Sequence, residues 1–171
     1  MKKLLVLPCA AILVALLAHL LAQESPTRAE LWKRYDEALK KGLPKTAITH
    51  LEPIIKSALV EKRYAEAIKA IGKKIAVEGN IQGNQPQEKI KRMQAAIAEA
   101  PKEMQPVMDA ILANWYWHYF QRNRWRFIQR TRAGQAAGKD FETWDLPRIF
   151  TEIDKQFTKA LSAKAVLKKT P

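Results

Sequence analysis

Three carboxylates, Glu99, Glu103 and Asp109, come nearest in this chain to a catalytic pair. Two carboxyl groups on either side of a glycosidic bond can hydrolyse it, one as the acid and the other as the base or nucleophile. Acidic residues on helices are, however, usually solvated surface charges. Their spacing does not single out a pair, so the sequence does not predict a glycosidase site.

The other reactive residue types stand apart from one another. His50 and His118 fall on different predicted helices, without the spacing of a zinc site. No glycine-rich phosphate loop precedes a helix. The serines of the exported part are Ser25, Ser57 and Ser162, and no nucleophile-elbow motif surrounds any of them. We therefore predict that the protein is not an enzyme and that it has no catalytic, cofactor-binding or metal-binding residues.

Aromatic and arginine residues gather in one segment. Seven of the 14 aromatic residues lie between Trp115 and Phe127, and no Asp or Glu occurs between Asp109 and Asp140. Trp and Arg are enriched at interaction hot spots, and guanidinium groups stack on aromatic faces. One interpretation is a central helix buried on more than one side; the other is a contact surface. The candidate interaction surface consists of Trp117, Arg122, Arg124, Trp125 and Arg126.

Helical spacing divides this segment into two faces. One face is expected to carry Met104, Met108, Ile111, Trp115 and Tyr119, and to continue as Arg122 and Arg126. The opposite face is expected to carry Trp117, Phe120, Phe127 and Ile128.

Residues 1–22 have the three-part pattern of a signal peptide. Two lysines precede an apolar run from Leu4 to Leu21, and Ala22 is the expected last residue removed. Leu20 is not the small residue expected two positions before cleavage, so an uncleaved membrane anchor is the alternative. We expect the protein to be exported to the periplasm or the cell surface.

The exported part would have 28 basic and 17 acidic residues, a formal charge of +11. Such an excess favours anionic partners. After export, envelope components are nearer to the protein than nucleic acid is. Nucleic acid is also disfavoured because no RNA- or DNA-binding motif is present. The alternative is that the lysines only solvate helical faces.

Apolar residues recur at three- and four-residue steps, which predicts a single helical domain over residues 24–162. We expect two subunits, about 24–79 and 86–162, separated by a loop from Gly79 to Pro86. A polar linker is expected around 134–139, and a basic tail without a closing element over 163–171.

Local signals predict where several helices begin and end. A helix after Thr27 should end at Gly42, and Pro44 should begin the next one. Asp145 should cap the last helix. That helix is expected to bury Ile149, Phe150, Ile153, Phe157 and Leu161.

The first two predicted helices share a pattern: Leu-Trp-x-x-Tyr, followed by a Lys-Gly-Leu-Pro-Lys-x-Ala turn. The residues that define it are Trp32, Tyr35, Gly42, Leu43, Pro44 and Ala47. This pattern resembles the N-terminal helical region of large bacterial alpha-2-macroglobulin-like proteins. The Trp-Tyr-Trp block at 115–117 and Thr-Trp-Asp-Leu-Pro at 143–147 are similar to the continuation of that region in a subset of the family.

The resemblance implies an exported protein of a family that traps proteases, with tandem macroglobulin β-domains and often a Cys-Gly-Glu-Gln thioester. The only cysteine of this chain is Cys9, and no β-rich segment follows, so no reactive residue of the family is carried over. The matched region of the family is tetratricopeptide-like, but the pattern does not repeat here at the roughly 34-residue spacing of such repeats.

We therefore expect an all-α protein: an antiparallel, degenerate tetratricopeptide-like helical array with a long central aromatic helix. Its expected function is that of an exported, non-catalytic interaction module, stand-alone or truncated. Its partner would be another protein or missing downstream macroglobulin domains. The alternative is a basic protein that binds anionic envelope components or other polyanions.

Overall fold

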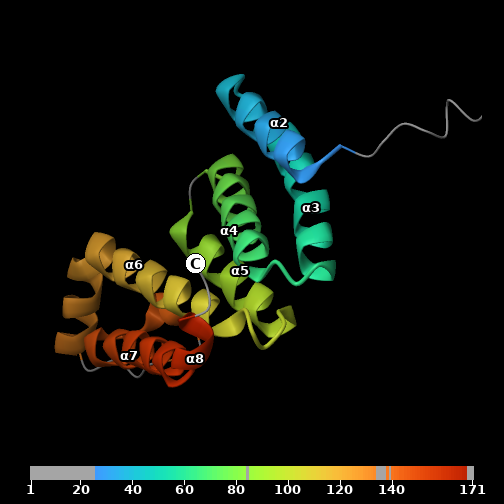
Figure 1. Cartoon of the computed structure of the whole chain (residues 1–171). Coiled ribbons are helices and arrows are strands. Elements are labelled where there is room, and N and C mark those ends of the chain that lie inside the picture. Colours follow the sequence, from blue (N-terminus) through green and yellow to red (C-terminus); the bar gives the residue numbers. More distant parts are fainter. Residues whose placement is uncertain (1–25, 84, 134–137, 139, 169–171) are drawn as a thin grey trace, which may run out of the picture.

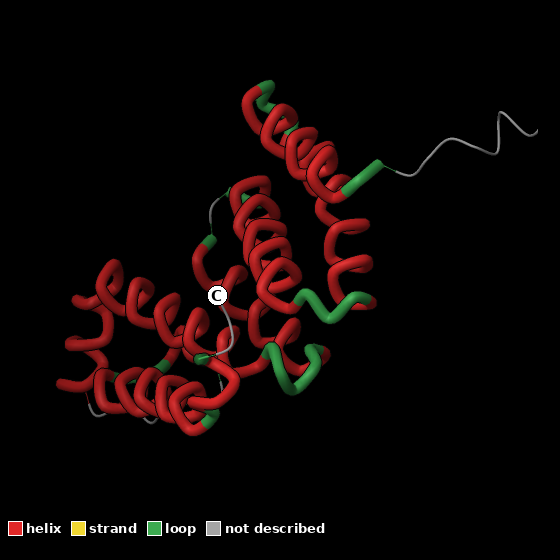
Figure 2. Tube along the Cα trace, viewed as in Figure 1, coloured by secondary structure: helices red, strands yellow, loops and turns green. Residues whose placement is uncertain are grey.

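The computed structural model describes residues 26–83, 85–133, 138 and 140–168, and every regular element within these ranges is a helix. The predicted all-α class is confirmed (Figure 2). The elements are α2 (Arg28–Lys40), α3 (Pro44–Val60), α4 (Tyr64–Ile81), α5 (Pro86–Glu99), α6 (Gln105–Ala133), the 3-10 helix η1 (Phe141–Thr143), α7 (Leu146–Ser162) and α8 (Lys164–Leu167).

The predicted signal peptide, residues 1–22, lies outside the described residues, as do residues 134–137 and 139 of the predicted linker. Within the described ranges, no helix combines the length and hydrophobicity needed to span a bilayer.

The helix boundaries predicted from local signals are confirmed. Thr27 caps α2 in a capping box, since its hydroxyl accepts from the amide of Glu30 while its own amide donates to the Glu30 carboxylate at 2.8 Å. Gly42 follows α2 with φ of 69°, a conformation that glycine adopts without strain, and Pro44 is the first residue of α3. The Asp145 side chain accepts from the amide of Arg148 at 3.0 Å and begins α7.

The predicted loop from Gly79 to Pro86 is wrong in its first part, because α4 continues to Ile81. Gly79 is buried inside the helix, where the side chain of Lys89 crosses it. A Cβ at Gly79 would lie 2.4 Å from the Cε of Lys89, so glycine serves close packing here and not chain reversal. The turn occurs at Gly83, with φ of 83°.

Each of the helices α3 to α6 packs mainly on the helix before it and the helix after it, whereas α2 packs mainly on α3 and α7 mainly on α6. In Figure 1, α2, α3 and α4 form one end of the molecule and α6, α7 and α8 the other, with α5 between them. The short helix α8 occupies part of the tail, where no closing element was expected.

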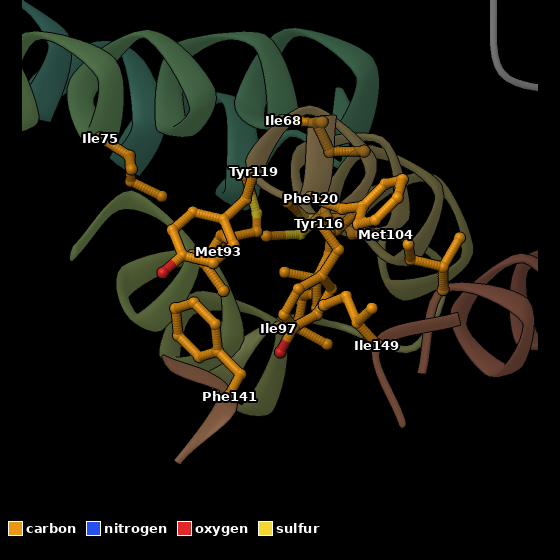
Figure 3. Close-up of a cluster of buried hydrophobic side chains, with 14 of the residues drawn as sticks. Ile68, Ile75, Met93, Ile97, Met104, Tyr116, Tyr119, Phe120, Phe141 and Ile149 are labelled. Carbon is orange, nitrogen blue, oxygen red and sulfur yellow. The ribbon is translucent and has the colours of Figure 1, made fainter. Parts of the chain in front are cut away.

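The buried side chains form two clusters. The smaller joins α2, α3 and α4, and it contains Leu31, Tyr35, Ala38, Ala47, Leu51, Ile54, Ala70 and Val77. The larger joins α3, α4, α5, α6, η1 and α7. Figure 3 shows Ile68, Met93, Tyr116, Phe141 and Ile149 converging there, together with Met104 from the turn before α6. Helix α4 therefore contributes to both clusters.

The predicted burial of α7 is only partly correct. Ile149 and Ile153 are buried, but three residues expected in the core are exposed: Phe150 (40%), Phe157 (39%) and Leu161 (55%). The buried residues of α7 follow a single narrow stripe, since this helix has its main neighbour, α6, on one side only. Residues 150, 157 and 161 lie beside that stripe and are only partly covered.

Candidate interaction surface on the long helix

Helix α6 is interrupted by a kink at Asn123, whose φ of −114° and ψ of 16° are not helical. The side-chain amide of Asn123 donates to the carbonyl of Tyr119 at 2.9 Å. Such a side-chain bond competes with the backbone ladder of a helix and accounts for a change of direction. The ribbon of α6 turns before the chain returns into α7 (Figure 1).

Several residues of the aromatic segment lie in the core, and α6 packs on both α5 and α7. Tyr116 is fully buried and Phe127 is 1% exposed. The Tyr116 ring lies 5.6 Å from that of Phe141 and 5.9 Å from that of Trp144, and its hydroxyl accepts from the side chain of Gln94 at 2.7 Å. Burial raises the pKa of Tyr116 strongly, so this phenol stays neutral.

The predicted surface residues are all exposed, including Trp117 (37%) and Trp125 (66%). Within the described part of the chain, no carboxylate lies within ion-pair distance of Arg122, Arg124 or Arg126. Some cations elsewhere are paired: examples are Arg28 with Glu61 at 2.6 Å, Arg92 with Glu78 at 2.7 Å and Lys74 with Glu52 at 3.0 Å. The second half of α6 has several arginines and no carboxylate of its own.

These residues do not form one surface. Trp117 and Arg124 face α7, where they line a groove of about 520 Å³, hereafter the α6–α7 groove. Arg122 faces α5 and lines a separate pocket of about 240 Å³. The two arginines are two residues apart in a helix, which places them on opposite sides of it.

The α6–α7 groove has aromatic walls. The rings of Phe120 and Phe150 lie 4.8 Å apart, and those of Trp117 and Phe150 lie 6.3 Å apart. The other lining residues are Gln121, Arg124, Ile128 and Leu146. The sequence did not predict this groove, because Phe150 was assigned to the core.

The residues considered for catalysis do not come together. Asp109 is 3% exposed and accepts from Lys159 at 3.0 Å, whereas Glu99 and Glu103 are exposed on the surface. His118 is exposed and His50 is partly buried on another helix. The described residues contain no group of three side chains that could hold a metal ion.

The residues that carry the family resemblance lie at the junction of α2 and α3 and have packing or turn roles. Trp32 donates from Nε1 to Glu66 at 2.9 Å and packs edge-on against Tyr35 at 5.7 Å. Ala47 is fully buried, whereas Leu43 is 49% exposed. Together with Gly42 and Pro44, they build the turn and the smaller buried cluster.

No protein-family model, no curated protein and no solved structure matches this chain.

Proposed function

We propose that the protein is a non-catalytic helical module that binds a partner protein in the α6–α7 groove. The partner would contribute an apolar side chain flanked by carboxylates. The observation that carries this proposal is an aromatic groove between Trp117 and Phe150 with the unpaired cation of Arg124 at its edge.

The shape and polarity of the groove favour a peptide segment. Aromatic side chains and arginine give the largest contributions to protein interfaces when an apolar anchor fills the space between them. Phe157 and Leu161, also exposed, extend the apolar face along α7 beyond Phe150. A partner with acidic residues beside its anchor would neutralise Arg124 and the neighbouring arginines.

The pattern around Trp32, Gly42 and Pro44 supports a protein partner as well. The similar region of alpha-2-macroglobulin-like proteins precedes tandem β-domains, which makes such domains candidate partners. We propose export to the periplasm or cell surface and a degenerate tetratricopeptide-like arrangement on the same grounds.

A second candidate function is binding of anionic envelope polymers. It is favoured by the exposed, unpaired arginines at positions 122, 124 and 126. Binding of this kind depends on counterion release and weakens steeply with salt. The two functions therefore differ in their dependence on ionic strength and on the aromatic groove.

The test is a selection of displayed random peptides on the purified protein. We expect enriched peptides to contain an apolar residue flanked by Asp or Glu, and to lose binding to Phe150→Ala and Arg124→Ala. Val60→Ala is the matched control, since Val60 is 78% exposed on α3, away from the groove. Retention on heparin is measured in parallel over a salt series.

Peptides that bind the Phe150→Ala variant as well as the wild type would contradict the groove proposal. Steeply salt-dependent heparin binding that requires all three arginines, without groove-dependent peptides, would instead support the polymer-binding function.

A further inference from the structure

The pocket on the opposite side of α6 brings two cations together. It lies between α5 and α6 and is lined by Lys89, Arg122 and His118, with Trp115 and Tyr119 as aromatic walls. No Asp or Glu is among the residues that line it. We call it the α5–α6 pocket.

Lys89 is held in place by the helix behind it. Its alkyl chain lies across Gly79 of α4, so close that a Cβ there would be 2.7 Å from Cγ and 2.4 Å from Cε. Its ammonium donates to the side-chain carbonyl of Asn80 at 3.1 Å. Gly79 is therefore a positioning residue for this cation.

Lys89 and Arg122 line the same pocket, and the charge of Arg122 disfavours that of Lys89. Burial and the positive charge of Arg122 lower the pKa of Lys89. The repulsion between two like charges in one pocket is relieved when an anion binds between them. Arg122 makes no ion pair within the described residues, so its guanidinium can form a bidentate contact.

We infer that the α5–α6 pocket binds a phosphate group that carries a small organic substituent. Arg122 and Lys89 donate to the phosphate oxygens, and the imidazole of His118 supplies a further donor. The pocket of about 240 Å³ is several times larger than a water molecule's share of liquid volume, roughly 30 Å³, and so has room for more than a bare phosphate. The substituent would lie against Trp115.

This inference is independent of the α6–α7 groove, because the two sites share no lining residue. Either one can fail without the other.

The experiment is a titration of the isotope-labelled protein with phenyl phosphate and with inorganic phosphate, followed by NMR. We expect saturable shifts centred on the Trp115 indole N–H and on the amides around Lys89 and Arg122. Phenyl phosphate should bind more tightly than inorganic phosphate because it also contacts Trp115. Lys89→Gln and Arg122→Gln should each weaken binding roughly tenfold or more, because each removes at least one charge-assisted hydrogen bond.

Arg132→Gln is the matched control, since Arg132 is an exposed arginine of α6 outside the pocket, and it should bind as the wild type does. Lys89→Arg should retain binding. Gly79→Ala should weaken binding by displacing Lys89, whereas Gly72→Ala, in the same helix with no atom within 4 Å of the added Cβ, should not.

Vesicles of phosphatidylglycerol distinguish a lipid headgroup from a free phosphate compound as the source of the ligand. Vesicle binding that requires Lys89 and Arg122 would support the site with a headgroup as its ligand. The inference is overturned if neither phosphate compound gives saturable shifts and vesicles do not bind through these residues. Shifts spread evenly over the exposed arginines and unchanged in Arg122→Gln would also overturn it.

Discussion

Lys159 of α7 donates from Nζ to Oδ1 of the buried Asp109 of α6 at 3.0 Å, and so links the two helices that form the groove. Asp109 is 3% exposed, while the Lys159 side chain is 51% exposed. In Lys159→Met, a buried carboxylate would lose its cation. Because the lysine is half exposed and solvent screens the pair, we expect a loss of about 1–2 kcal/mol in the free energy of unfolding.

Urea denaturation measures this loss. Lys56→Met, which removes an exposed cation from α3, should change the unfolding free energy by less than about 0.5 kcal/mol. Equal effects of the two substitutions would show that the Asp109–Lys159 contact does not stabilise the fold.

Two glycines should respond to alanine with opposite signs. Gly42 has φ of 69°, where a side chain is strained, so Gly42→Ala should destabilise the protein by roughly 1–2 kcal/mol. Gly72 lies in the interior of α4 with open space around its Cβ position, so Gly72→Ala should stabilise it by about 1 kcal/mol. Thermal unfolding of both variants gives the sign directly, and a shift in the same direction for both would refute the assignment.

Trp125 is a surface residue and Phe127 a core residue of the same segment. Phe127 is 1% exposed and packs against Tyr119 and Phe120, so Phe127→Ala should cost about 3–5 kcal/mol. Trp125 is 66% exposed, so Trp125→Ala should leave the unfolding free energy within about 0.5 kcal/mol of the wild type. Chemical denaturation compares them; a large loss in Trp125→Ala would place that side chain in the core.

Acid should weaken the attachment of α2 to α3. The hydrogen bond from Arg28, aided by its charge, lowers the pKa of Glu61 below its ordinary value of 4.5. The stabilisation is therefore fully present above pH 4.5 and is lost as the pH falls through the lowered pKa of the folded state.

Urea midpoints at neutral pH and at several pH values below 4.5 would test this. Glu61→Gln should lose part of the wild-type decrease, because it cannot titrate. Glu103→Gln, an exposed carboxylate of the described chain, is the control. An unchanged acid profile in Glu61→Gln would contradict the assignment.

The helix boundaries were predictable because their causes are local. Thr27, Gly42, Pro44 and Asp145 act on backbone groups within four residues of themselves, so the sequence around each one contains the whole signal. The helical class followed from periodicity for the same reason.

The errors came from contacts between distant residues. Gly79 is a residue type common in turns, but here its lack of a side chain allows the Lys89 side chain of the next helix to pack against it. Phe150, Phe157 and Leu161 are apolar residues typical of a core. They are exposed because α7 has its main neighbour on one side only. The sequence of a single helix does not reveal how many neighbouring helices will pack against it.

The candidate site was predicted in part. The sequence identified the exposed Trp117 and Trp125 and the arginines without carboxylates. It treated Arg122 and Arg124 as one surface, although helical spacing could have separated them. It did not identify Lys89, because only the packing of α5 on α6 brings that residue into the same pocket as Arg122.

Helix α4 supplies Ile68 and Ile75 to the larger buried cluster and Ala70 and Val77 to the smaller one. Its backbone amides are therefore protected from both flanks, and they should exchange with deuterium only when the whole protein opens. Helix α2, which lies at one end of the molecule and packs mainly on α3, can detach by a smaller excursion and should exchange sooner. The slowest amide exchange of the native protein should therefore occur in α4, in the middle of the chain.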